Sequence, residues 1–327
     1  MMSVVQEPDL AAIAAAIRMP ADAPRGSIRA RRQRRALLEP TGDRLSELAT
    51  WWAAVSGTTA PQRVEQLWSA GPSAAPGSVG AELLARPFDR PKTVAEALTW
   101  GVAAADDAVD AGADLLLVSV PTDEDDVGWQ VLAVHLLAVD LLEAIGWPNT
   151  DRSTDAQWSA RVAAVRDGLR RVRGIRNQPE RLLTEVDSPA LAAGTALLLQ
   201  AAARRTPVLL DGPGAAACAL LAHRVARAGR SWWQSSDAGH LGLHDRILTE
   251  LRLPPLTRLG LPTEDGTAAR IGLALLETAL ARALESDADL PDEPDDELPL
   301  DEPNVSLPPD EPPLDKSEDD VGPAPGA

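Results

Sequence analysis

The stretch RRTPVLLDG, from Arg204 to Gly212, decides the fold of this chain. Its apolar residues, Val208 to Leu210, end at Asp211 and Gly212 and lead into a small-residue helix predicted over Gly214 to Ala226. An apolar run that is bounded by turn residues and followed by a helix is typical of a buried parallel strand in α/β proteins. We therefore predict a strand here, with Asp211 at its carboxyl end.

Two further strands are predicted from the same pattern. The run ADLLLVSV, from Ala113 to Val120, follows a helix predicted over Val94 to Ala111 and a glycine that suits a helix end. Trp232 and Trp233 indicate another strand after the helix that follows Asp211. This alternation predicts right-handed crossovers and an α/β fold, with a mainly parallel, Rossmann-like sheet flanked by helices.

In open parallel sheets, ligands bind beyond the carboxyl ends of the strands. In this chain, polar residues follow the predicted strands at this position. Asp211, the run Ser235 to His240 and the run Thr263 to Thr267 are expected to converge on one crevice. Simpler roles remain open, because Ser236 or Asp237 can cap a helix, and so can the acids and threonine before the last helix. A serine hydrolase is not expected, because the sequence around Ser236 lacks the GxSxG of a nucleophile elbow.

The same residues carry a family resemblance. The motifs PVLLDG, then S-x-x-GH, then PL-x3-GL-x4-GT-A resemble the C-terminal half of the nicotinate-nucleotide:dimethylbenzimidazole phosphoribosyltransferases. That family makes α-ribazole phosphate, a precursor of the lower ligand of cobalamin. The resemblance extends from about Asp110 to Leu284, is faint from Leu38 to Val55, and fails between about Pro61 and Phe88.

The resemblance implies an active site. The family's general base, a glutamate, aligns with Asp265, and Glu264 stands beside it as a substitute. This general base would take a proton from the benzimidazole while the second ring nitrogen attacks C1′ of the ribosyl group and nicotinate leaves. Arg161 would bind the phosphate, and the N–H groups of Gly266 and Thr267 would cradle it. The other substrate-binding residues that the resemblance implies are Gly128, Asp211, Gly212, Ser236 and His240.

Several family motifs are altered in this chain. Four consecutive acids, Asp123 to Asp126, precede Gly128, and Trp129 to Val131 replace an Asn-Thr-Thr that admits the nucleotide at a helix N-terminus. A Gly-Thr-Gly turn is replaced by Thr150 to Arg152. The second hypothesis is therefore a catalytically degenerate paralogue that acts as a binding or regulatory module.

The segment from Pro61 to Pro91 lacks the family's strand ending in Asp-His-Gly-Val. Because it is rich in Gly, Pro, Ser and Ala, it is predicted as loop around one short helix near Val64 to Trp68. Further on, Pro121 to Gly146 is predicted to contain one long apolar helix, and Asp155 to Val172 an amphipathic one.

Three regions are predicted. Residues 1–60 together with 268–285 form a small helical subdomain, and residues 61–267 form the α/β domain. Residues 286–327 hold fifteen acids and one lysine, which is −14 of the formal net charge of −18, and many prolines. Such a tail is expected to be disordered, because little apolar surface offsets the entropy of ordering it.

Composition limits the partners. An acidic body does not suit nucleic acid, despite the basic run from Arg29 to Arg35. No apolar run approaches the ~20 residues of a membrane span, no signal peptide is recognised, and a cytoplasmic protein is expected. The single cysteine, Cys218, excludes an internal disulfide and a cysteine-cluster metal site. No metal or cofactor is expected; the resemblance implies nicotinate mononucleotide and a benzimidazole base as substrates, and a homodimer.

Overall fold

The structure is a computed structural model, and it describes residues 8–20, 43–56, 58–68, 82–86, 91–121, 126–146, 154–175, 177–261 and 265–288. The chain divides into two units, 1–289 and 290–327, and all described residues lie in the first. The predicted tail therefore lies outside the described residues, except that its first three positions belong to the last helix. Arg29 to Arg35 and Glu264 also lie outside them.

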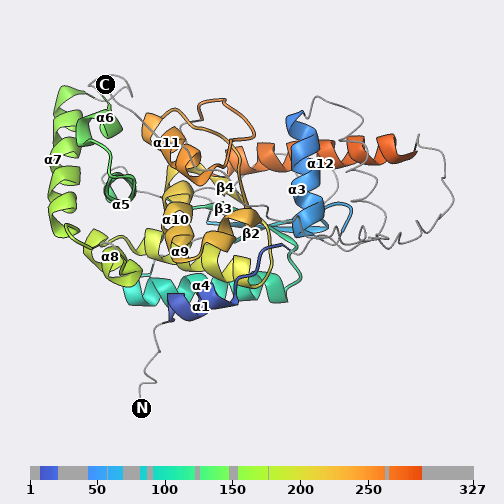
Figure 1. Cartoon of the computed structure of the whole chain (residues 1–327), viewed down its shortest axis with the longest axis horizontal. Helices are drawn as coiled ribbons and strands as arrows, with labels where there is room; N and C mark the ends of the chain where they lie inside the picture. Colours follow the sequence, from blue (N-terminus) through green and yellow to red (C-terminus); the bar gives the residue numbers. More distant parts are fainter. Residues whose placement is uncertain are drawn as a thin grey trace, which may run out of the picture. The chain divides into compact units, whose positions relative to one another are not determined.

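A five-stranded parallel sheet forms the centre of the first unit (Figure 1). Its order is β2-β1-β3-β4-β5, which confirms the predicted fold class. The strands are β1 (Arg63–Leu67), β2 (Glu82–Arg86), β3 (Leu115–Ser119), β4 (Val208–Asp211) and β5 (Trp233–Ser235). Every residue of β3 and β4 is buried, as expected for strands covered on both faces.

The prediction for residues 61–91 was wrong, because β1 and β2 lie there. Strand β1 stands in the interior of the sheet but carries Glu65 and Gln66, so no continuous apolar run marks it. Both polar side chains are buried and find tertiary partners. Arg86 Nε of the neighbouring strand donates to Glu65 Oε1 over 2.5 Å, and Arg270 Nε donates to Gln66 Oε1 over 2.6 Å.

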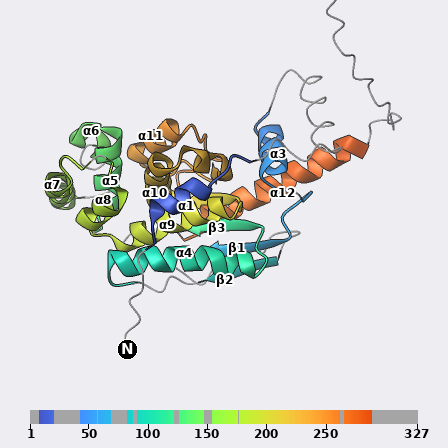
Figure 2. The same cartoon turned by 60° about the horizontal axis from the view of Figure 1, so that its bottom comes forward.

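Helices cover the sheet, and α10 and α12 contact β3 and β4 directly. A long helix, α4, runs along α9 (Figure 2). The helices are α1 (Leu10–Ala16), α3 (Arg44–Val55), α4 (Val94–Asp110), α5 (Gly128–Leu137), α6 (Leu141–Ile145), α7 (Asp155–Arg171), α8 (Pro179–Val186), α9 (Pro189–Ala203), α10 (Gly212–Val225), α11 (Gly242–Leu251), α12 (Thr267–Ala288) and the 3₁₀-helix η1 (Arg227–Trp232). No described helix is long and apolar enough to cross a membrane.

The long helix predicted within 121–146 is divided into α5 and α6. Ala138 has a left-handed conformation (φ 54°), which ends α5. The Asp140 carboxylate then accepts hydrogen bonds from the N–H groups of Leu142 and Glu143 and caps α6. An aspartate inside an apolar run thus marks a helix start.

One N-terminal helix packs against the C-terminal helix. Helix α3 lies beside α12 in both views, and Arg282 of α12 forms an ion pair with Asp43, the N-cap of α3 (Figures 1 and 2). Helix α1 contacts α9 and α10 instead. The grouping of all N-terminal helices into one subdomain stays a prediction.

Candidate active site at the carboxyl edge of the sheet

The strand order places a topological switch at the centre of the sheet. The chain proceeds from β1 to β2 on one side, and from β2 it returns past β1 to β3, β4 and β5 on the other side. In doubly wound sheets, ligands bind at this point, beyond the carboxyl ends of the strands. Ser119 pairs in register with Asp211, so β3 and β4 end level, and the beginning of α12 reaches their ends.

Asp211 joins three segments at this edge. Its side chain is fully buried, and Oδ2 accepts hydrogen bonds from Ser119 Oγ over 2.9 Å and from the backbone N–H of Gly266 over 2.6 Å. A buried carboxylate is tolerated when such donors replace water. The first turn of α12 is thereby held against the ends of β3 and β4.

Gly266 fits its position because it lacks a side chain. Its φ is +87°, and a Cβ there would lie 1.8 Å from Nε2 of Gln66. The Gln66 amide covers this glycine and accepts the Arg270 hydrogen bond through Oε1, which fixes the amide orientation. Gln66 and Arg270 were missed from the sequence, the first because its strand was missed and the second because only the fold brings it here.

Asp265, the candidate base, lies directly before α12 and is partly exposed. Its Oδ1 accepts a hydrogen bond from the N–H of Thr267 over 3.0 Å. Burial lowers the pKa of the Arg270 guanidinium, and the negative charge of Asp265 acts in the opposite direction. Asp265 therefore faces a partly buried cation in the first turn of the same helix.

The backbone donors that were expected to cradle a phosphate are occupied by carboxylates of the chain itself. Asp211 accepts from Gly266 N–H, and Asp265 accepts from Thr267 N–H. These two N–H groups are therefore not free to bind a phosphate in this structure. The physical reason is that an aspartate satisfies the free N–H groups of a helix start as a phosphate would.

Gly128 shows the same arrangement at the start of α5. Asp126 Oδ1 accepts from its N–H over 2.7 Å, and Asp126 Oδ2 accepts from Ser188 Oγ over 2.9 Å. Of the four predicted acids, Asp126 is the described one, and it fills the helix terminus that was expected to receive the nucleotide.

Arg161 is not brought to this edge. It lies in α7, which packs against α5, α6 and α8. Both views place α7 on the far side of the molecule from α12 (Figures 1 and 2). The described residues therefore do not unite Arg161 with Asp265.

The residues after β5 organise a loop. Asp237 accepts from the N–H groups of Gly239, Leu259 and Leu261 and from Thr257 Oγ1. Burial raises the pKa of its carboxyl, but these hydrogen bonds together lower it below the usual value. The capping alternative for these residues was wrong, because α11 begins after Leu241 without a side-chain cap.

The other predicted residues near this edge differ in exposure. Ser236 is fully buried under Gly272, whereas His240 is exposed, so the two do not form a nucleophile and base pair. Gly212 opens α10 with φ +81° directly after Asp211. Among the described residues, no group of three or more acidic, histidine or cysteine side chains is placed to hold a metal ion.

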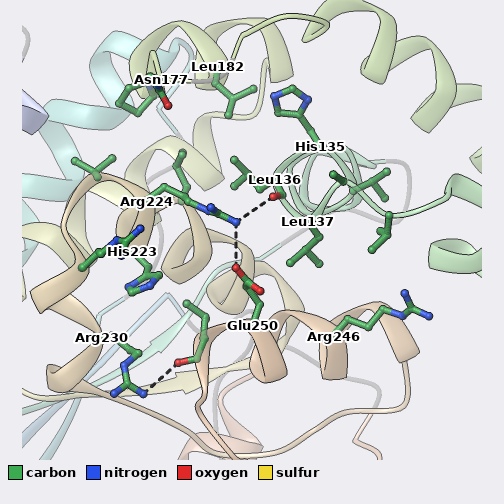
Figure 3. A pocket seen from close by; sticks show the side chains of 18 of the residues that line it. His135, Leu136, Leu137, Asn177, Leu182, His223, Arg224, Arg230, Arg246 and Glu250 are labelled. Carbon is green, nitrogen blue, oxygen red and sulfur yellow. Dashed lines mark hydrogen bonds and ion pairs between the residues drawn. The ribbon is translucent and has the colours of Figure 1, made fainter. Parts of the chain in front are cut away.

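A large cavity among the described residues lies elsewhere. It measures about 1820 Å³ and is lined by the C-terminal ends of α5, α10 and α11 (Figure 3). Helix α10 starts at the carboxyl edge of the sheet, so its last residues lie near the amino edge. The position of Asp211 and Asp265 thus follows from topology and hydrogen bonds, and not from cavity size.

Comparisons with known proteins agree on one family. A family model described as phosphoribosyltransferase matches residues 90–288. A nicotinate-nucleotide–dimethylbenzimidazole phosphoribosyltransferase of Mycobacterium avium (strain 104) is 38% identical over 185 residues, which are 57% of this chain and 52% of that protein. The enzyme of that name from Streptomyces avermitilis is 36% identical over 57% of this chain and 49% of its own length. The chain thus spans about half the length of these curated relatives.

Two crystal structures of proteins from Thermus thermophilus share the fold. One, of a nicotinate-nucleotide–dimethylbenzimidazole phosphoribosyltransferase, has a TM-score of 0.59 and 22% identity, and the match covers 86% of this chain and 96% of that chain. The other, titled CobT, has a TM-score of 0.61 and 20% identity over 88% and 100% of the two chains. At these identities the likeness concerns the fold alone.

Proposed function

The chain belongs to the phosphoribosyltransferase family whose model matches residues 90–288, and we propose that it transfers phosphoribose from nicotinate mononucleotide to 5,6-dimethylbenzimidazole or a related base. The names of the relatives support this choice of substrates. The observation that carries the proposal is the carboxylate of Asp265 before α12, held over the ends of β3 and β4 by the Asp211–Gly266 hydrogen bond.

In the proposed reaction Asp265 is the general base. Its carboxylate takes the proton from one ring nitrogen of the base while the other nitrogen forms a bond to C1′. The bond between C1′ and the pyridinium nitrogen breaks, and its electron pair leaves with nicotinate. Glu264, outside the described residues, is the second candidate for this role.

An anionic group of the substrate needs a cation at this edge. Arg161 remains the residue that the family pattern suggests, but α7 is remote from α12. Arg270 is better placed, because it lies in the first turn of α12 and has a described hydrogen bond only through Nε. We therefore assign the phosphate to the Nη groups of Arg270, which can bind it in two-pronged fashion.

A second candidate function is a non-catalytic binding module. It is favoured by the three carboxylates, Asp126, Asp211 and Asp265, that already occupy the N–H groups expected to bind phosphate. A phosphate would have to displace them, and their negative charge opposes its approach. Under this proposal the nucleotide binds without being converted.

One pair of measurements separates the candidates. Purified protein is incubated at high loading with nicotinate mononucleotide and dimethylbenzimidazole, and α-ribazole phosphate is quantified. Product that disappears when Asp265 and Glu264 are both changed to Ala supports the transferase. Calorimetric binding of nicotinate mononucleotide with no product supports the binding module, and neither binding nor product rules out both.

Assembly and location are part of the same proposal. We infer a homodimer, as the resemblance implies, located in the cytoplasm. Light scattering of the purified protein tests the first point. A mass near twice the 34.5 kDa of the chain is expected, and the monomer mass alone contradicts it.

A further inference from the structure

The large cavity near the amino edge is separate from the proposed active site. Helix α10 begins after Asp211, and residues of its last turn line the cavity together with the ends of α5 and α11. The fourteen residues of α10 place the cavity about 20 Å from Asp211, at 1.5 Å per residue. A ligand in this cavity would therefore not contact Asp265.

Arginines dominate the charged residues of this cavity. Two acids, Asp245 and Glu250, also line it, although the whole chain carries a formal net charge of −18. The arginines of the lining are Arg173, Arg224, Arg227, Arg230, Arg246 and Arg252. A concave positive surface on an acidic protein is expected to attract anions.

Half of these arginines have a structural role. Arg224 donates to the carbonyl of Leu136 at the end of α5 and pairs with Glu250 (Figure 3). Arg230 donates to carbonyls at the end of α11. Such cations stabilise helix C-termini, where carbonyl groups lack partners and the helix dipole is negative. Arg246 pairs with Glu143 of α6.

The other three arginines have no such partner. Within the described part of the chain, no carboxylate forms an ion pair with Arg173, Arg227 or Arg252. All three are exposed and come from different segments, after α7, within η1 and at the end of α11. Their charges are thus not neutralised by the fold itself.

His223 also lines the cavity, and three of the arginines act on its ring. Burial lowers the pKa of His223, and the positive charges of Arg230, Arg227 and Arg224 lower it further. A hydrogen bond with the Arg227 backbone acts in the opposite direction, but the pKa stays below its usual value.

We propose that this cavity binds a small molecule with several phosphate groups, held by the guanidinium groups of Arg173, Arg227 and Arg252. Planar guanidinium groups match phosphate oxygens in pairs, and three of them on separate segments suit a chain of phosphates. Leu136 and Leu137, which are partly exposed, offer apolar surface to the rest of the ligand (Figure 3). A nucleoside triphosphate fits this chemistry, and the volume exceeds the ~300–1,000 Å³ of ordinary ligand pockets.

The test uses calorimetry on the full chain with ATP, inorganic tripolyphosphate and citrate as probes. Saturable binding of ATP or tripolyphosphate is expected, weakened about 100-fold in the double variant Arg227→Ala/Arg252→Ala, about tenfold for each lost charged contact. Arg166→Ala is the matched control, because Arg166 is exposed on α7 and does not line the cavity. It should bind as the unchanged protein does.

A second readout locates the ligand. The pKa of the His223 imidazole, followed by NMR, should rise when ATP or tripolyphosphate is bound, because the anion offsets the arginine charges. No saturable binding overturns the proposal. Binding that the double variant retains, binding that leaves the His223 pKa unchanged, or a preference for citrate overturns it equally.

Discussion

The Asp211 carboxylate and the backbone N–H of Gly266 lie 2.6 Å apart although 55 residues separate them in the chain. The same oxygen, Oδ2, accepts the hydroxyl of Ser119 at the end of β3. This single atom therefore sets the distance between the sheet and the first turn of α12. Because Asp265 directly precedes Gly266, its position over the edge depends on Asp211.

The variant Asp211→Ala should be strongly destabilised. It removes the acceptor of two buried donors, Ser119 Oγ and Gly266 N–H, and hydrogen bonds to a charged group contribute about 1.5–3 kcal/mol each. We expect the free energy of unfolding in urea to fall by about 3 kcal/mol. Asp211→Asn, which keeps an acceptor oxygen, should lose less than half of that. Equal losses for both variants would contradict the role given to this carboxylate.

Asp265→Asn should separate catalysis from capping. The amide oxygen of asparagine can still accept from Thr267 N–H, so the free energy of unfolding should change by less than about 0.5 kcal/mol. The amide cannot take a proton, so kcat should fall by about 10²–10⁴-fold. Steady-state production of α-ribazole phosphate measures this. Asp167→Asn, an exposed acid on α7, is the control and should retain full activity.

Much of the fold could be predicted because the sequences of its central strands are distinctive. Strands β3 and β4 are wholly buried apolar runs between turn residues, so composition alone identified them. Strand β1 is also buried, except at its first residue, but it contains Glu65 and Gln66. Oε1 of each of these side chains accepts a hydrogen bond from a partner 21 or 204 residues away in the chain, which no local pattern reveals.

The site was predicted in part for the same reason. Asp211 and Asp265 follow or precede regular elements, so their place at the carboxyl edge could be inferred from topology. The hydrogen-bond donor that each carboxylate contacts depends on the tertiary structure. From the sequence, the N–H groups of Gly266 and Thr267 were therefore predicted to be free to bind phosphate. The position of Arg161 depends on how α7 packs, and helical periodicity does not determine that.

Gly266→Ala should damage both stability and activity. The added Cβ would lie 1.8 Å from Gln66 Nε2, and φ is +87°, so both sterics and backbone conformation oppose it. We expect the free energy of unfolding to fall by about 2–4 kcal/mol. Gly242→Ala is the matched control, since a Cβ there meets no atom within 4 Å.

Because Gly242 opens α11, its replacement by alanine should leave stability unchanged or raise it slightly. Urea unfolding of both variants gives the comparison. If Gly266→Ala unfolds like Gly242→Ala, Gln66 does not cover the start of α12 as the structure has it.

His244 should make the protein sensitive to mild acid. It is 2% exposed, and burial lowers its pKa from 6.5 to about 4, with the carboxylates of Asp237 and Asp245 opposing this shift and His240 adding to it. In mild acid, the unfolded chain therefore binds a proton at His244, whereas the folded chain does not. The contribution to stability is complete above about pH 6.5 and is lost as pH falls toward 4, by about 3 kcal/mol in total.

The variant His244→Leu removes this titration, so its free energy of unfolding should depend less on pH between 6.5 and 4 than that of the unchanged protein. Other groups titrate in both proteins. The effect of His244 is therefore the difference between the two proteins in how their free energy of unfolding changes with pH. Parallel curves for the unchanged protein and His244→Leu would show that the pKa of His244 does not change on folding, and hence that burial does not lower it.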